Sequence, residues 1–287
     1  MLRIKILISR ITLILFLLLI NSTLDVAYGG TSANVKRTIH VDRAGTLSDH
    51  ISDSEKYIIE ELTLTGELNG TDFRLLRDMG GTNYKGEITS GVLTSLDLTD
   101  SRIVAGGEMY LDAKSISYQT ERGTGEISIQ FHCSIEQDNT IPFAVFVGCK
   151  FKSICLPKSI ISIEKEAFSC CWALTDIVIP EGVTSIGDQA FSSCTSLSGI
   201  NLPESMTDIG YATFSDCSNL VSIRLPDNIN QIGQSCFLWC SKLNTIDLPQ
   251  KLKSIDICVF SECTSLTSIT IPSNVTSIND LAFHNCI

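Results

Sequence analysis

A 23-residue pattern of apolar positions repeats through the second half of the chain. Prolines and phenylalanines each recur at this interval without exception. The prolines are Pro157, Pro180, Pro203, Pro226, Pro249 and Pro272, and the phenylalanines are Phe168, Phe191, Phe214, Phe237, Phe260 and Phe283. Because the repeated positions are mainly apolar, the units are expected to share one core. A period of this length predicts a solenoid, in which each unit buries its apolar face against its neighbours.

Each unit is expected to contain a short strand, a turn and a short return, as residues 174–194 illustrate. Ile177 and Ile179 alternate with Val178, which is the period-2 pattern of a strand with one buried face. Pro180 lacks the N–H group that would continue a ladder, so it ends the strand. The Ala, Phe and Cys that follow are spaced like one helical turn. Six such units predict a curved parallel sheet roughly 30 Å across, since neighbouring strands lie about 4.8 Å apart.

The complete pattern L-x-x-I-x-[LI]-P-x-x-V-x-x-I-G-x-x-A-F-x-x-C occurs from Leu174 to Cys194. It resembles the BspA-like leucine-rich repeats of exported bacterial surface proteins, and the resemblance covers residues 141–287. It implies a leucine-rich-repeat solenoid, a curved stack of short parallel strands with helical or turn returns. Five positions that depart from the pattern, and weaken single turns only, are Thr213, Cys236, Val259, Asp256 and Asn279.

Residues 1–29 have the pattern of a secretory signal peptide. Three basic residues come first, an unbroken apolar run follows over 13–20, and small residues close the segment around Ala27 and Gly29. The run is too short to span a bilayer, and a retained N-terminal anchor is the alternative interpretation. The sequence therefore predicts an exported protein, secreted or at the cell surface, with no membrane span once the signal is removed.

Residues 30–100 are less regular. Residues 35–41 are expected as an edge strand, and 62–64 and 96–98 as two short strands of the leucine-rich kind. A helix is expected over 71–79, with Thr71 as its cap and two glycines at its end. The stretch resembles the irregular N-terminal units of the same family, which implies that it covers the open end of the stack.

Residues 101–140 are polar and contain several glycines. The alternation of Ile127, Ile129 and Phe131 predicts one strand, and the stretch is interpreted as an insertion with little core of its own. The regular repeats are expected to occupy 141–287.

Charge excludes one class of partner. The chain has 21 basic and 32 acidic residues, a net charge of −11. Without residues 1–29, 18 basic and 31 acidic residues remain, a net charge of −13. Binding to phosphates needs a basic surface, so nucleic acid is not expected as a partner.

The twelve cysteines of this exported chain would normally suggest disulfides. Seven of them form one column of the repeat: Cys149, Cys171, Cys194, Cys217, Cys240, Cys263 and Cys286. Parallel side chains on stacked units keep Cβ atoms about 4.8 Å apart, beyond the reach of a disulfide. The column is therefore predicted to be a ladder of small buried thiols. The spacing does not exclude one disulfide among the off-column cysteines Cys133, Cys155, Cys170 and Cys258.

Candidate chemistry is sparse. The adjacent pairs His132-Cys133 and Cys170-Cys171 suggest a zinc site, but the chain lacks the C-x-x-C spacing typical of one, so no metal is expected. The four histidines show no catalytic spacing, and no nucleotide-binding loop or nucleophile elbow occurs. We expect no enzyme activity and no cofactor.

Candidate binding residues come from the geometry of the unit. Residues that flank the second buried position of each strand are expected on the concave face, and the residues after three successive prolines should give that face an acidic edge. The candidates are Asp176, Asn201, Arg224 and Asp247 on the face, Glu181, Glu204 and Asp227 on the edge, and Trp172 and Trp239 at the far turn.

Two functional hypotheses follow. The resemblance implies an exported recognition protein that binds a protein, matrix component or glycan at a surface, including one derived from a host. The alternative is an architectural spacer for a module outside this sequence. Because Ile287 follows the last cysteine of the column without a polar capping unit, we expect a longer natural chain or a partner that covers this end.

Overall fold

A computed structural model describes residues 34–120, 123–127 and 130–286. The predicted signal peptide, Ile129 and Ile287 lie outside these residues. The chain divides into two compact units, Met1–Val35 and Lys36–Ile287, and the second is described below. In the described part of the chain, no helix has the length and apolarity of a membrane span.

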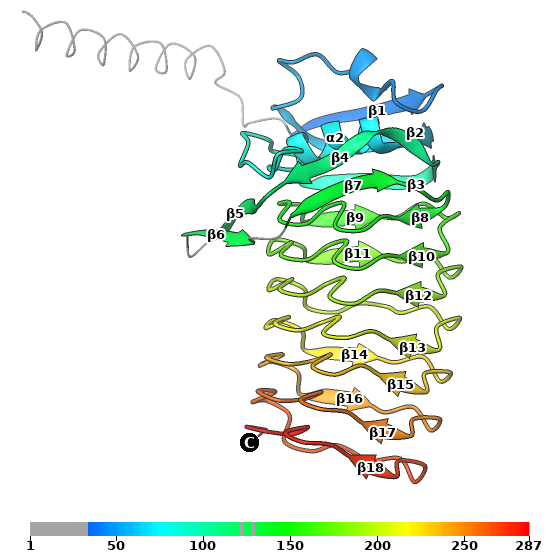
Figure 1. Cartoon of the computed structure of the whole chain (residues 1–287), viewed down its shortest axis with the longest axis vertical. Helices are drawn as coiled ribbons and strands as arrows, with labels where there is room; N and C mark the ends of the chain where they lie inside the picture. The colour runs from blue at the N-terminus through cyan, green and yellow to red at the C-terminus, as the bar shows by residue number, and fades with distance from the viewer. Residues whose placement is uncertain (1–33, 121–122, 128–129, 287) are drawn as a thin grey trace, which may run out of the picture. The chain divides into compact units, whose positions relative to one another are not determined.

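The N-terminal elements start the solenoid (Figure 1). In chain order they are β1 (Val35–Val41), the 3-10 helix η1 (Leu47–Asp49), β2 (Ile59–Leu68), α2 (Gly70–Met79) and β3 (Ser95–Ile103). β1 is the edge strand of the sheet β1-β2-β3-β9-β11, as predicted. The two predicted leucine-rich strands lie within β2 and β3, which pair in parallel with Leu62 opposite Leu96. The irregular units therefore begin the same sheet that the regular repeats continue.

Helix α2 begins at a different cap from the one predicted. Asn69, not Thr71, is the N-cap: its Oδ1 accepts the Thr71 N–H at 3.0 Å, and its own N–H bonds to Asp72 Oδ2 at 2.9 Å. This reciprocal capping box satisfies two N–H groups at once, which a cap at Thr71 would not. Gly80 ends the helix, as expected.

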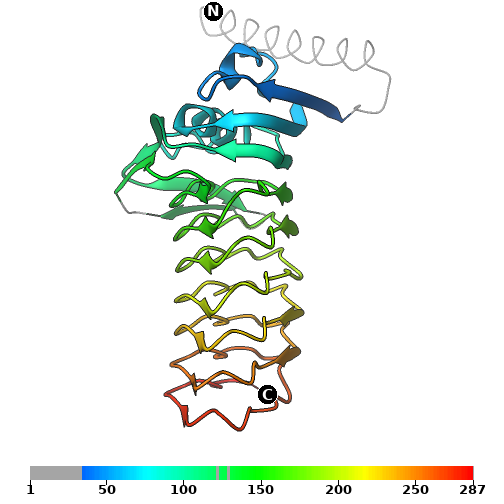
Figure 2. The ribbon, with the colours of Figure 1, turned by 90° about the vertical axis from the view of Figure 1, so that its right-hand side faces the viewer.

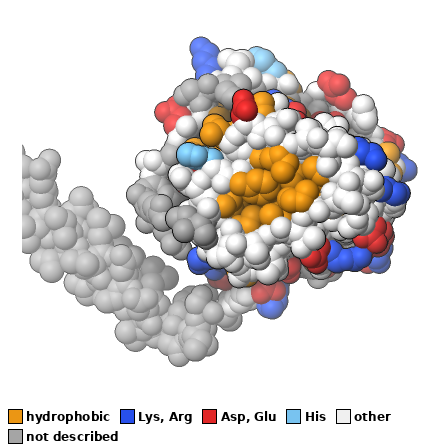
Figure 3. All heavy atoms as spheres, turned by 90° about the horizontal axis from the view of Figure 1, so that it is seen from below, with side chains coloured by type: hydrophobic (Ala, Val, Ile, Leu, Met, Phe, Trp, Pro, Cys, Tyr) orange, Lys and Arg blue, Asp and Glu red, His pale blue; other side chains and the backbone are white. Residues whose placement is uncertain are grey.

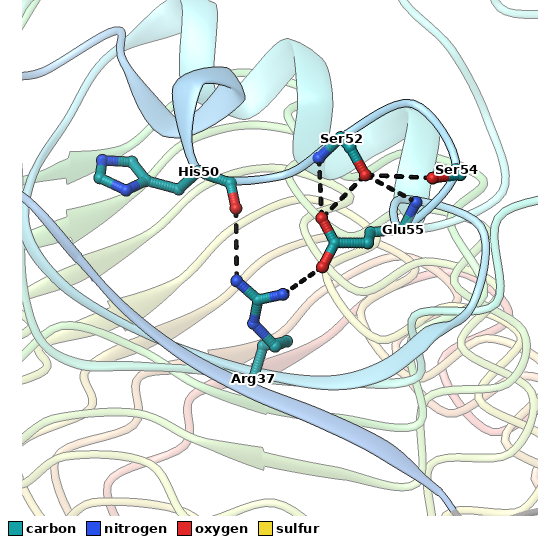
Figure 4. A network of polar contacts seen from close by, with 5 residues as sticks. All are labelled: Arg37, His50, Ser52, Ser54 and Glu55. Atoms are coloured by element: carbon teal, nitrogen blue, oxygen red, sulfur yellow. Dashed lines mark hydrogen bonds and ion pairs between the residues drawn. The ribbon is translucent and has the colours of Figure 1, made fainter.

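A polar network holds the first strand to the loop that follows it (Figure 4). Arg37 forms an ion pair with Glu55, and its Nη2 donates to the His50 carbonyl at 3.3 Å. Ser52 and Glu55 cap each other, with the Ser52 N–H 3.1 Å from Glu55 Oε2. These N–H and hydroxyl donors, the Ser52 N–H first, lower the pKa of Glu55. The network ties β1 to the N-terminal cap.

The insertion contains a core, contrary to the sequence-based expectation. Its strands are β4 (Gly106–Ala113), β5 (Ile116–Thr120), β6 (Gly123–Ile127) and β7 (Phe131–Ile135), paired antiparallel as β4 with β7 and β5 with β6. Tyr110, Leu111, Ile116 and Phe131 are at most 1% exposed. Apolar residues alternate with polar ones along β7, so one face of the insertion is buried.

The insertion interrupts a single coil. β3 pairs with β9 (Ser153–Cys155) in the first ladder of strands, and β8 (Thr140–Ile141) pairs with β10 (Ser162–Ile163) in the second. β3 and β8 are therefore the two strands of one coil, although residues 104–139 separate them.

The regular coils stack as two parallel ladders (Figure 2). The first ladder continues with β11 (Asp176–Val178), β14 (Ser222–Arg224) and β16 (Thr245–Asp247). The second continues with β12 (Ser185–Ile186), β13 (Asp208–Ile209), β15 (Gln231–Ile232), β17 (Ser254–Ile255) and β18 (Ser277–Ile278). Partners are 23 residues apart, as in Ser222 with Thr245. The fold is the predicted solenoid of short parallel strands, and turns form its return side.

A column of phenylalanine rings fills the centre of the stack. From Phe168 to Phe283, successive ring centroids lie 5.2 to 5.7 Å apart and the rings are within 12° of parallel. Phe214 and Phe237 are 0% exposed. Each ring except that of Phe283 therefore packs between the rings of the coils before and after it.

The turns on the return side use left-handed backbone conformations at two positions in each coil. These positions lie two residues before and two residues after the phenylalanine, with φ between 50° and 65°: Glu166, Gln189, Ala212, Ser235, Cys258 and Leu281, and Cys170, Ser193, Asp216, Trp239, Glu262 and Asn285. Such angles are uncommon for residues other than glycine. Here they orient alternate peptide groups along the stack.

The aligned peptide groups form hydrogen bonds in one direction. The N–H groups of Glu166, Phe168 and Cys170 donate to carbonyls of the next coil at 2.8 to 3.0 Å, and later coils repeat this pattern. The carbonyl ends consequently face the N-terminal cap.

Two side chains cap these carbonyl ends. Tyr110 Oη donates to the Phe143 carbonyl at 2.6 Å, and Arg77 Nη1 donates to the Val145 carbonyl at 2.8 Å. Arg77 is 0% exposed and forms no ion pair with any described carboxylate. Aligned peptide dipoles place partial negative charge at their carbonyl end, which stabilises a buried guanidinium.

The last described coil presents apolar side chains at the end of the stack (Figure 3). Ile278 and Leu281 are 53% and 57% exposed. The expectation that more chain or a partner covers this end stays a prediction.

We expect Phe214→Ala to destabilise the protein by about 3–5 kcal/mol, because it leaves a cavity between two neighbouring rings. The matched control is Phe283→Ala in the last described coil, where the ring is only half-buried and the cost should be smaller. Circular dichroism melts measure both. An unchanged melting temperature for Phe214→Ala would show that the ring column does not carry the core.

Candidate recognition surface

The first ladder of strands presents two exposed columns. In β11 and β14 the middle isoleucine is buried and both flanking residues are exposed. Pairing places Arg224 beside Asp247, and Asp176 beside Ser153. Three of the four residues predicted on this face therefore lie in its columns, and we call these columns the strand face.

Asn201 joins the strand face without a regular strand. It forms an isolated parallel bridge with Arg224 and is exposed. Gly199 stands two residues before it, and glycine weakens strand formation because it has no side chain to pack. The fourth predicted residue is therefore in its column, in a coil whose first strand is reduced to one bridge.

The edge beside the strand face is acidic, as predicted, but one of its carboxylates is paired. Glu181, Glu204 and Asp227 are all exposed. Arg224 Nη1 lies 2.8 Å from Glu204 Oε1, and both side chains are solvated, so this pair contributes little stability. Glu181 and Asp227 have no ion-pair partner among the described residues. These two carboxylates remain available to a cationic partner.

The two tryptophans do not join the strand face. Trp239 lies on the return side of its coil and is 54% exposed. Trp172 is half-buried, and its Nε1 has no hydrogen-bond partner in the described part of the chain. Trp239 is therefore a separate candidate anchor, whereas the buried indole nitrogen of Trp172 makes that side chain less accessible.

A pocket was missed by the reasoning from sequence. It has a volume of about 180 Å³, lies between β7 and the coil that the insertion interrupts, and is lined by Tyr110, Glu136, Phe143 and Glu164 among others. One sequence signal was available: Glu164 stands at the position occupied by Gly187 in the next coil.

Comparisons with known proteins agree with the repeat pattern. The family model for the BspA type leucine rich repeat region matches residues 128–244 and 161–287, with six copies. The chain belongs to this family. Among curated proteins, none matches the chain.

Three solved structures of leucine-rich repeat proteins resemble this BspA-type chain. A T. pallidum protein is 28% identical, with 57% of this chain and 83% of that chain covered and a TM-score of 0.47. A Eubacterium ventriosum protein is 19% identical, with 81% and 84% covered and a TM-score of 0.47. A leucine rich cell surface protein of Faecalibacterium prausnitzii is 17% identical, with 88% and 74% covered and a TM-score of 0.34.

The cysteine column of the BspA-type repeats is a hydrogen-bonded ladder. None of the twelve cysteines forms a disulfide. The seven cysteines of the column are buried, except that Cys286 in the last described coil is half-buried. From Cys171 onward, each Sγ donates to the phenylalanine carbonyl of the preceding coil at 3.0 to 3.2 Å. The thiols thus link neighbouring coils without covalent bonds.

Burial keeps these thiols protonated. It raises the pKa of Cys149 to about 11 and that of Cys263 to about 12, because a thiolate would lose its hydration inside the stack. A protonated, buried thiol is a poor nucleophile. The column therefore has a structural role.

The two candidate metal pairs do not converge on a site. His132 is exposed and lies 2.7 Å from Asp112, whereas Cys133 faces the buried side of β7. Cys170 and Cys171 are both buried. Within residues 34–120, 123–127 and 130–286, no three His, Cys, Asp or Glu side chains are grouped to hold a metal ion.

We expect a thiol reagent at pH 8 to modify few cysteines in the native protein and all twelve after denaturation.

Since the pKa values of the thiols are raised in the folded protein, its stability should be greatest below about pH 8.5, where the thiols of the unfolded chain are also protonated, and should fall as the pH rises toward about 11. Thiol titration with denaturant melts at several pH values measures both effects. Finding most thiols paired after denaturation would contradict the ladder.

Proposed function

We propose that the chain is an exported surface protein that recognises a protein, matrix component or glycan, including one from a host, through its strand face. The observation that carries the proposal is the pair of in-register exposed columns, in which Arg224 lies beside Asp247 while the isoleucines between the columns are buried. Leucine-rich repeat proteins of this kind typically serve as non-catalytic binding scaffolds.

The strand face suits an extended partner. Its side chains are small and mostly polar, and they recur at every coil, about 4.8 Å apart. The described columns contain no aromatic anchor, and the largest apolar side chain in them, Val178, is 52% exposed. Binding would therefore rest on many modest contacts and not on one central anchor.

The acidic edge favours a partner with positive charge. Glu181 and Asp227 are exposed carboxylates without ion pairs among the described residues, and the whole chain is acidic. A basic or cation-bridged partner would be attracted, with the largest effect at low salt.

The alternative is an architectural spacer. The continuous ring column and the one-directional hydrogen bonds favour it, because they join each coil firmly to the next. A spacer would have no ligand on the strand face, so a binding measurement distinguishes the two functions.

The test is the double charge reversal Glu181→Lys with Asp227→Lys. The matched control is Asp49→Lys with Asp280→Lys, which changes net charge equally at exposed carboxylates away from the strand face. We expect the first variant to bind matrix and cell-surface preparations about tenfold more weakly at low salt, with a smaller difference at high salt. Equal binding by both folded variants would show that the acidic edge is not part of the binding site.

A further inference from the structure

The pocket of about 180 Å³ is formed where the insertion rejoins the interrupted coil. Tyr110 of β4, Cys133 and Ile135 of β7, and Phe143 after β8 contribute to its wall, and Glu164 of the next coil completes it. The site is separate from the strand face and does not depend on the function proposed for that face.

Two carboxylates, and no Lys or Arg side chain, line the pocket. Glu164 Oε2 accepts the Phe143 N–H at 2.8 Å, and its Oε1 has no partner among the described residues. Glu136 forms no ion pair with any described residue, and no Lys or Arg lines the pocket. His132 at the rim is already paired with Asp112. Glu136 and Glu164 therefore form no ion pair with a Lys or Arg in the described part of the chain.

Two further polar groups of the wall, the Cys133 thiol and the Tyr110 hydroxyl, carry no charge at neutral pH. Burial raises the pKa of Cys133 to about 11 and moves that of Tyr110 far above its usual range. Phe143, which is half-buried, offers aromatic surface, which attracts cations. The Phe143 carbonyl also lies at the negative end of the aligned peptide groups of the return side.

The chemistry of the wall selects an organic cation. Ile135 and Pro142 are apolar, while Glu136 and Glu164 supply charge, so the pocket matches a ligand with a short hydrocarbon stem and a charged end. In the described part of the chain, the His, Cys and carboxylate side chains here are not grouped as metal ligands.

We propose that this pocket binds the ammonium end of an alkylamine, either as a free small amine or as a lysine side chain of a partner protein. Both sources share the same contacts: the carboxylates of Glu136 and Glu164 on the ammonium, and the ring of Phe143 beside the stem.

The test measures binding of three probes to the full chain by calorimetry and by amide chemical shifts of Ile135 and Phe143. The probes are n-butylammonium, Nα-acetyl-lysine N-methylamide, and neutral n-butanol. Glu136→Gln removes one charge without removing any described contact, and Glu164→Gln keeps an oxygen for the Phe143 N–H. The matched control is Asp49→Asn, which neutralises an exposed carboxylate in η1 outside both candidate sites.

We expect n-butylammonium to bind saturably, at least tenfold more weakly in Glu136→Gln and in Glu164→Gln, and with unchanged affinity in Asp49→Asn. Binding of n-butylammonium alone identifies a free amine, whereas equal or tighter binding of the lysine amide identifies a partner's side chain. Failure of both cations to saturate, equal shifts with n-butanol, or full binding by Glu136→Gln would overturn the proposal. If Glu164→Gln fails to fold, the Glu136→Gln variant decides the test alone, because that substitution disturbs no described contact.

Discussion

The stack depends on hydrogen bonds that each coil can complete only through the next one. On the return side, the N–H groups of Phe168 and its counterparts donate to the following coil, and the carbonyl groups of the residues just before these phenylalanines accept from the preceding coil. A single coil would leave these groups unpaired inside an apolar core, where each costs about 1–3 kcal/mol. The left-handed turns at positions such as Glu166 and Cys170 are therefore strained locally but required by the stack.

The same constraint explains residues that look misplaced when considered alone. Arg77 is a fully buried arginine, yet it lies at the carbonyl end of the ladder, where aligned dipoles favour a cation. The Phe191 carbonyl accepts the N–H of Cys194 in its own coil and the thiol of Cys217 in the next, both at 3.2 Å. Cysteine suits this column because it is small and apolar and also carries a donor.

The repeat could be predicted from the sequence because proline, phenylalanine and cysteine keep one interval throughout. The strand face followed from the same alternation, and Asp176 and Asp247 lie in their predicted columns. The interrupted coil could not be predicted for two reasons. Thr99 stands where later coils have proline, and the second strand of this coil, β8, begins only at Thr140. The cap at Arg77 and the pocket at Glu164 arise from contacts between residues on either side of that interruption. Such long-range contacts cannot be predicted from a local sequence pattern.

Amide hydrogen exchange of the native protein tests the one-directional ladder most directly. Turns usually exchange rapidly, but we predict that the amides of Phe168, Phe191 and Phe214 exchange at least about 100-fold more slowly than those of Glu181 and Glu204. The latter two amides follow prolines on the opposite side of the coil and have no hydrogen-bond acceptor among the described residues. Equal exchange rates in the two sets would contradict the ladder and, with it, this explanation of the stack.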